Sequence, residues 1–316
     1  FPAARQQPRR AHMTGPLPFL RRIGLGTAQF GLDYGITNRN GALSKDATAE
    51  ILNRARTLGI SLLDTAPAYG DSESVIGSLD PAGNFDIVTK LSPVAVESIG
   101  PADTDMMERE FDGSLKRLGR SRVAGVLVHH GRQLFAPGGE HLLALLNTLR
   151  DSGRAQKIGV SVYDGDEIDK VLERFTPDII QVPISVADQR LIQSGHLEKL
   201  KNAGVEIHAR SLFLQGTLLR DACDLPAFFA TALPGFRNIK ARARENGITS
   251  LQLCLAFAAH VPQLDRLIVG VSSVEEFAEI TAAAAMGTVI DCDMNDLALS
   301  NPAMLDPSGW PSQVKP

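Results

Sequence analysis

The feature that most constrains the fold of this chain is a regular alternation of short apolar runs with segments of helical period. Eight runs of four or five residues are rich in aliphatic side chains, as buried parallel strands are. They are Ile23–Thr27, Leu62–Thr65, Ile87–Lys90, Gly125–His129, Ile158–Val162, Ile179–Val182, Val205–Ala209 and Leu267–Val271. A strand and a helix repeated eight times predict an α/β fold of the (β/α)8 barrel type, in which the carboxyl ends of all strands meet at one face.

The segments between these runs carry start and stop signals of helices. We expect helices at Lys45–Leu58, Ser72–Leu79, Thr104–Leu118, Glu140–Ser152, Gly165–Arg174, Gly195–Asn202 and Val274–Ala285. Ser44, Ser72 and Ser273 stand before acidic first turns and are expected to cap helix starts. Glycine is expected to end four helices, at Gly59, Gly119, Gly153 and Gly204.

The main competing fold is an open, doubly wound sheet. That fold has a glycine-rich phosphate turn after its first strand, whereas Gly24-Leu25-Gly26-Thr27-Ala28-Gln29 lacks the third glycine. The barrel is therefore the favoured fold.

We assign residues 13–316 to a single barrel domain with a long insertion between its seventh and eighth strands. A chain of 316 residues is within the size range of such barrels. Helical patterns occupy Phe236–Glu245 and Ser250–His260 within the insertion, which is expected to lie over the active face. Residues 1–12 hold three arginines and no acid, and we interpret them as a tag or a disordered extension.

Composition excludes several classes of function. The net charge is −4 and no basic stripe with interleaved aromatic residues is present, so nucleic acid is not an expected partner. The apolar runs are much shorter than a membrane span. Cys223, Cys254 and Cys292 are widely spaced and form no CxxC pair, which argues against a zinc site or disulfide framework and favours a cytoplasmic protein.

Ionisable side chains stand at the ends of three consecutive predicted strands. Asp64, Lys90 and His129 each follow an apolar run, and Tyr69 comes five residues after Asp64. A lysine ammonium favours the phenolate form of a nearby tyrosine and so lowers the tyrosine pKa. The carboxylate would hold the lysine charged, and the histidine would orient a substrate oxygen. Together the four side chains suit protonation of a carbonyl oxygen while hydride reaches the carbon, or the reverse reaction.

Each of these residues also has a purely structural interpretation. An aspartate after a strand often caps a helix, and a lysine at a strand end is usually a solvated surface charge. The histidine and the tyrosine could each cover apolar surface. The occurrence of all four at three consecutive strand ends favours the chemical interpretation.

Several motifs, in order from about residue 22 to residue 285, resemble the aldo-keto reductase superfamily. They are Gly24-Leu-Gly-Thr27, Asp64-Thr-Ala-Pro-Ala-Tyr-Gly70, Val88-Thr-Lys90, Ser114-Leu-Lys-Arg-Leu-Gly119, Leu127-Val-His129, Ile158-Gly-Val-Ser161, Gln181-Val-Pro183, Ser211-Leu-Phe-Leu-Gln-Gly216 and Ile268-Val-Gly-Val-Ser-Ser273. The resemblance implies NAD(P)H-dependent reduction of an aldehyde or ketone, or oxidation of an alcohol. It makes Tyr69 the acid, Asp64 and Lys90 its tuning pair, and His129 the orienting residue.

The resemblance also implies a site for a nicotinamide cofactor. Its contacts would come from Gly26, Thr27, Asp64, Ser161, Gln181, Arg210, Ser211, Leu212, Leu214, Gly216, Ser272, Ser273, Glu276 and Glu279. Val162 stands where the family usually has asparagine, and Arg210 stands where it has an aromatic residue under the nicotinamide ring. The resemblance favours NADP(H). NAD(H) stays open, because no Lys or Arg lies between residues 270 and 285, where Glu276 and Glu279 would repel a phosphate.

Two other functions stay open, as do the substrate and the oligomeric state. One is a regulatory, redox-sensing subunit that binds the nucleotide with little turnover. The other is an isomerase or aldolase with Lys90 as nucleophile, which a lysine kept charged by Asp64 disfavours. A small carbonyl or alcohol substrate is expected to meet the loops at 30–34, 131–139 and 213–234, whose apolar and aromatic residues are Phe30, Tyr34, Phe135, Phe228 and Phe229. The sequence does not decide whether the tail with Trp310 folds over this pocket.

Overall fold

Eight parallel strands close into a barrel in the computed structural model, which describes residues 19–311 except 37, 39–40, 96 and 287–292. Each strand pairs with the next along the chain, and β8 pairs with β1. The strands are β1 (Ile23–Gly26), β2 (Leu62–Asp64), β3 (Asp86–Leu91), β4 (Val123–Val128), β5 (Ala155–Ser161), β6 (Ile179–Pro183), β7 (Glu206–Arg210) and β8 (Arg266–Gly270). The (β/α)8 prediction is confirmed. The boundary predicted between residues 12 and 13 lies outside the described residues.

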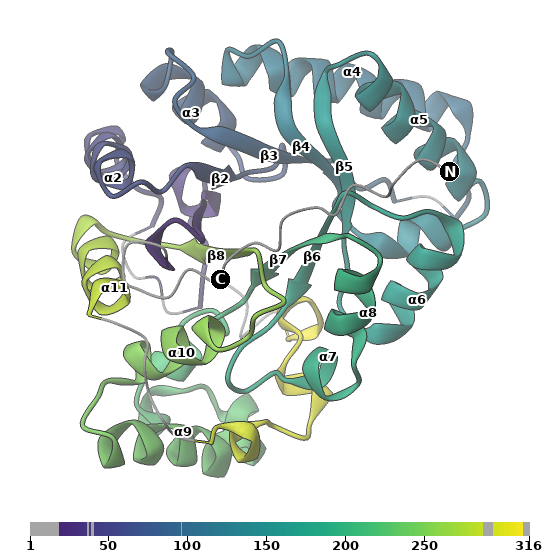
Figure 1. Ribbon diagram of the computed structural model, residues 1–316. Coiled ribbons are helices and arrows are strands. Elements are labelled where there is room, and N and C mark those ends of the chain that lie inside the picture. Colours follow the sequence, from purple (N-terminus) through teal and green to yellow (C-terminus); the bar gives the residue numbers. More distant parts are fainter. Residues whose placement is uncertain (1–18, 37, 39–40, 96, 287–292, 312–316) are drawn as a thin grey trace, which may run out of the picture.

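Helices surround the barrel, as Figure 1 shows. They are α2 (Lys45–Thr57), α3 (Ser72–Leu79), α4 (Pro101–Leu118), α5 (Gly139–Asp151), α6 (Gly165–Arg174), α7 (Arg190–Gln193), α8 (His196–Asn202), α9 (Leu233–Glu245), α10 (Ser250–Ala259) and α11 (Val274–Ala285). Helix α4 begins three residues before its predicted start, because Pro101 suits a first helical position and Asp103 accepts a hydrogen bond from the Gly100 N–H at 2.8 Å. The short helix α7 was not predicted.

Two of the three expected serine caps are confirmed. Ser44 accepts a hydrogen bond from the Ala47 N–H, and Ser273 accepts one from the Glu276 N–H. The prediction for Ser72 was wrong, because its hydroxyl instead donates to the carbonyl oxygen of Thr27 at 2.9 Å and so joins α3 to the end of β1. The glycines expected to end helices all have a left-handed φ between 65° and 80°: Gly59, Gly119, Gly153 and Gly204.

Apolar side chains fill the middle of the barrel and determine which residues face its carboxyl end. Leu62, Val88, Leu127, Ile179 and Ile268 form a separate buried cluster inside the barrel. Successive side chains of a strand point to opposite faces, so residues two positions further along a strand point to the same side. The residues two positions after the first four are Asp64, Lys90, His129 and Gln181. These polar side chains therefore lie above an apolar floor.

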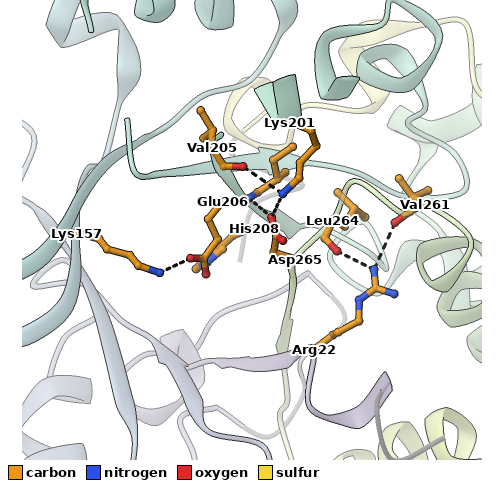
Figure 2. A network of polar contacts seen from close by, with 10 residues as sticks. Arg22, Lys157, Lys201, Val205, Glu206, His208, Val261, Leu264 and Asp265 are labelled. Atoms are coloured by element: carbon orange, nitrogen blue, oxygen red, sulfur yellow. Dashed lines mark hydrogen bonds and ion pairs between the residues drawn. The ribbon is translucent and has the colours of Figure 1, made fainter. Parts of the chain in front are cut away.

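A network of ion pairs closes the amino end of the barrel (Figure 2). Lys157 of β5 pairs with Glu206 of β7, and the second oxygen of Glu206 lies 2.9 Å from Nε2 of His208. Beside them, Lys201 lies 2.7 Å from Asp265, the residue before β8. These four charged or ionisable side chains and Asp265 are thus paired within the network, and Arg22 beside them donates to the carbonyl oxygen of Leu264.

The insertion between β7 and β8 is covered by the C-terminal segment, residues 293–311. The two predicted helices are present as α9 and α10, and α9 begins three residues earlier than expected. Trp310 is buried, with its ring centroid 5.0 Å from that of Phe229 in the insertion. Figure 1 shows this segment, in yellow, beside α9. Within the described part of the chain, every helix is too short or too polar to cross a lipid bilayer.

Candidate active site

A buried ion pair lies at the carboxyl end of the barrel. Nζ of Lys90 lies 2.6 Å from Oδ1 of Asp64 and donates to the carbonyl oxygen of Thr65 at 3.0 Å. Gln181 reaches across from β6 and donates to Oδ2 of Asp64 at 2.8 Å. Burial acts to lower the pKa of Lys90, but Asp64 and Tyr69 outweigh it, so the pKa lies above its ordinary value. The lysine is therefore held charged and in one place.

Tyr69 lies against this pair in the loop that follows β2. Nζ of Lys90 is 5.1 Å from the centre of the tyrosine ring. Burial raises the pKa of Tyr69, and the charge of Lys90 acts in the opposite direction, with a net shift above the ordinary value. The charge of Lys90 thus acts to lower the Tyr69 pKa, as expected. The predicted net lowering of this pKa was wrong, because the effect of burial is larger. The phenol is protonated at neutral pH and has a proton to give.

His129 completes the predicted set as a neutral imidazole. Its ring lies 6.0 Å from the ring of Tyr69, nearly perpendicular to it. Burial, followed by the charges of Lys90, His130 and Arg210, lowers the pKa of His129 to about 3. Nδ1 of His129 is buried and has no hydrogen-bond partner among the described residues. Of the four predicted catalytic side chains, Asp64 and Tyr69 line the neighbouring cavity, whereas Lys90 and His129 do not.

A cavity of about 570 Å³ opens beside Asp64 and Tyr69 and extends to the start of α11. The expected cofactor residues that line it are Gly26, Asp64, Gln181, Arg210, Ser211, Leu212, Gly216, Ser272 and Glu276. Those that do not line it are Thr27, Ser161, Leu214, Ser273 and Glu279. Of this second group, Thr27 donates from its hydroxyl to the carbonyl oxygen of Asp64 at 3.0 Å, whereas Glu279 is exposed on α11.

The turn after β7 is strained where it borders the cavity. Ser211, Leu214 and Gln215 have φ values of 63°, 47° and 52°, in the left-handed region that non-glycine residues rarely adopt. Each such residue costs roughly 1–3 kcal/mol and persists only where surrounding contacts hold it. Strain of this kind is found at ligand sites, and it fixes the path of the backbone along the cavity wall.

Two of the charged residues that line the cavity, Glu276 and Arg210, have different surroundings. Glu276 of α11 accepts hydrogen bonds from the backbone N–H of Ser272 at 2.6 Å and from its hydroxyl at 2.7 Å. The guanidinium of Arg210 stacks over the ring of Tyr163 at 4.3 Å and donates to the carbonyl oxygen of Val162 at 3.2 Å. The carboxylate therefore has protein donors, whereas the guanidinium has only neutral partners in the part of the chain that the structure describes.

Part of the predicted substrate pocket was wrong. Phe30 and Phe229 are buried in the core, and Phe228 packs on Phe229 and Trp310 rather than on the cavity. Phe135 does not line the cavity, and Tyr34 does.

Sequence analysis missed several residues of the cavity wall, among them Tyr163, Pro307 and Ser308. The position of Tyr163, just past the end of a predicted strand, was a usable signal for it. No local signal marked the two tail residues.

Comparisons with known proteins give the family and the fold of this chain. The sequence model described as "Aldo/keto reductase family" matches residues 22–298. The chain is 29% identical over 218 residues to an NADH-specific methylglyoxal reductase of Escherichia coli, covering 63% of this chain and 65% of that protein. It is 24% identical to L-galactose dehydrogenase of Arabidopsis thaliana, covering 92% and 93% of the two chains.

A solved structure supports the fold. The holo form of an aldo-keto reductase from Bacillus halodurans superposes with a TM-score of 0.68 at 17% identity, covering 89% of this chain and 93% of that one. The family model covers most of the chain, and the chain belongs to the aldo/keto reductase family.

Proposed function

We propose that this protein is an oxidoreductase that reduces an aldehyde or ketone to an alcohol, or catalyses the reverse, with a nicotinamide nucleotide as hydride carrier. The observation that carries this proposal is the buried pair of Asp64 and Lys90 beside a protonated Tyr69. The family to which the chain belongs, and the reductases and dehydrogenases among its relatives, support it.

Tyr69 is the proton donor in this proposal. During reduction its hydroxyl proton moves to the carbonyl oxygen, and the phenolate that remains is stabilised by the ammonium of Lys90. Asp64 keeps that ammonium charged and fixed, since the lysine nitrogen lies 2.6 Å from the carboxylate. A lysine held in this state is a poor Schiff-base nucleophile, which disfavours the isomerase or aldolase alternative.

His129 orients the carbonyl group. With a pKa of about 3 it is neutral at physiological pH, so it donates from one ring nitrogen without competing with Tyr69 as an acid. The nitrogen without a protein partner would accept or donate a hydrogen bond to the ligand, according to its tautomer.

The cavity residues fit a dinucleotide. The nicotinamide, when bound, supplies hydride to the carbonyl carbon. Gln181, at the end of β6, would bind its carboxamide. The turn from Ser211 to Gly216, together with Gly26, would meet the diphosphate through backbone groups. Ser272 at the start of α11 would contact the adenosine part.

The resemblance to the superfamily favours NADP(H), but the surroundings of Glu276 support NAD(H), which we propose as the cofactor. The Glu276 carboxylate accepts hydrogen bonds from the N–H and the hydroxyl of Ser272, the groups that a 2′-phosphate would need. A phosphate there would meet a like charge, whereas ribose hydroxyls can donate to a carboxylate. The E. coli relative is named an NADH-specific enzyme.

Nicotinamide absorbance, followed with NADH and with NADPH against a broad carbonyl panel, tests the proposal. Steady multiple turnover, faster with NADH, is the expected result. Tight nucleotide binding with no turnover on any carbonyl would instead support the regulatory, redox-sensing alternative. A cytoplasmic location stays a prediction.

A further inference from the structure

Arg210 is a partly buried cation without a carboxylate partner among the described residues. Three other partly buried arginines are paired with carboxylates, namely Arg120 with Asp80, Arg154 with Glu108 and Asp112, and Arg190 with Asp188, whereas Arg22 is held by backbone carbonyl oxygens. The contacts of Arg210 to oxygen are long, at 3.2 Å to Val162 and 3.4 Å to the hydroxyl of Ser211. Removing a charge from water without a counter-ion is costly, which points to an anion supplied by a ligand.

The guanidinium is held in a fixed orientation at the cavity wall. One face lies over the ring of Tyr163, with 4.3 Å from the guanidinium carbon to the ring centre. A guanidinium has five N–H donors, and the two long contacts leave others for a ligand. A planar group fixed in this way favours the two parallel hydrogen bonds that a carboxylate accepts.

Arg210 acts on the reacting end of the cavity. Its charge contributes to lowering the pKa of His129 and opposes the rise in the pKa of Tyr69. Arg210 and Tyr69 also line the same cavity, so an anion on Arg210 would share this cavity with the carbonyl group that Tyr69 addresses. A ribose separates the nicotinamide ring from the diphosphate of a dinucleotide, so the diphosphate is the less favoured source of the anion.

We propose that Arg210 binds the carboxylate of the substrate, so that the preferred substrates are oxo acids or aldehydes that carry an acid group. This inference rests on the proposed carbonyl reduction and assigns its substrate class. Among the described charged residues that line the cavity, Arg210 is the one cation, and Asp64 is already paired with Lys90.

Matched substrates test this assignment. We would compare kcat/KM for 4-carboxybenzaldehyde with that for its methyl ester, and for succinic semialdehyde with that for butanal, at saturating cofactor. The wild type is expected to prefer each acid by roughly 10- to 100-fold, mostly through KM, because a hydrogen bond to a charged group contributes about 1.5–3 kcal/mol. In Arg210→Met the ratio of acid to neutral substrate should fall to about one, and Arg210→Lys should keep part of it.

The outcomes separate the inference from the function on which it rests. Turnover of the neutral substrates with no preference for the acids overturns the inference alone. An equal loss on acid and neutral substrates in Arg210→Met, with weaker binding of NADH measured by its fluorescence, also overturns it, because Arg210 would then serve the cofactor. No turnover of any of the four compounds would reject both proposals. Thermal unfolding of the variants checks that they are folded.

Discussion

The two ends of the barrel both hold buried ionisable side chains but satisfy them in different ways. At the amino end, Lys157, Glu206 and His208 pair with one another, and Arg22 is bound by backbone carbonyl oxygens (Figure 2). At the carboxyl end, Asp64 and Lys90 pair with each other, but among the described residues Nδ1 of His129 has no hydrogen-bond partner and Arg210 has no carboxylate partner. In barrel enzymes, the first arrangement is typical of stability and the second of catalysis.

The pKa shifts at the two ends differ in the same way. The hydrogen bonds of Glu206 to His208 and Lys157 outweigh burial and lower the pKa of its carboxyl to about 2, which favours the charged form. At the carboxyl end, burial keeps Tyr69 and His129 neutral. One open nitrogen is present at the amino end too, Nδ1 of His208, and neither this histidine nor His129 is among the residues that line the cavity.

The largest effect is expected from Tyr69→Phe. This change removes the proton donor and leaves the ring, so kcat for carbonyl reduction should fall by about 10²- to 10⁴-fold. The affinity for NADH, measured by fluorescence titration, should stay within about threefold of the wild type because the phenol oxygen is not needed to hold the nucleotide. A variant that reduced its best substrate at the wild-type rate would refute the role of Tyr69.

Lys90→Met should cause the largest loss of stability. It leaves Asp64 as a buried charge without its cation, and the free energy of unfolding in urea should fall by about 3–5 kcal/mol. The double variant Asp64→Asn with Lys90→Met should recover much of this stability while remaining inactive. Recovered activity in the double variant would contradict a catalytic role for the pair.

Glu276→Gln should change the preference for NADH over NADPH, measured as a ratio of kcat/KM values, by about tenfold. Removing the charge beside Ser272 relieves repulsion of a 2′-phosphate, so the ratio of kcat/KM for NADH to that for NADPH should fall. Activity with NADH is the internal control for an intact site. An unchanged ratio would show that the carboxylate does not select between the two nucleotides.

The smallest effects are expected at the amino end. Lys157→Met breaks a partly exposed pair and should cost at most about 1 kcal/mol of unfolding free energy. Because the folded pKa of Glu206 lies below its ordinary value of 4.5, its carboxylate stabilises the fold above that pH, and this contribution is lost as the pH falls toward about 2. Glu206→Gln should flatten this part of the stability profile and leave kcat unchanged.

Strand ends were predictable from sequence, because an apolar run with a polar residue at its end is a local pattern. Asp64, Lys90 and His129 were placed together on that basis, and the side chains of Asp64 and Lys90 are in contact. Gln181, which also contacts Asp64, was expected nearby only from the family resemblance. Ser72 shows the limit of local patterns: a serine before an acid reads as a cap, yet a hydrogen bond to Thr27, 45 residues away, decides its position.

The residues that line the cavity could not all be predicted, because their positions depend on contacts between segments far apart in the sequence. Phe228 and Phe229 belong to a loop that sequence analysis assigned to the pocket. Trp310, about 80 residues later, draws them into a buried aromatic cluster instead. The stacking of Arg210 on Tyr163 likewise joins the ends of two strands with β6 between them, so neither residue alone predicts it.

The transfer of hydride in a single turnover tests the central claim most directly. The enzyme is loaded with NADH, mixed rapidly with a reactive aldehyde, and followed by nicotinamide absorbance, for wild type and for Tyr69→Phe. The account predicts rapid oxidation of the bound NADH by the wild type and almost none by the variant, with equal amounts of nucleotide bound. Oxidation at the same rate in both proteins would contradict it.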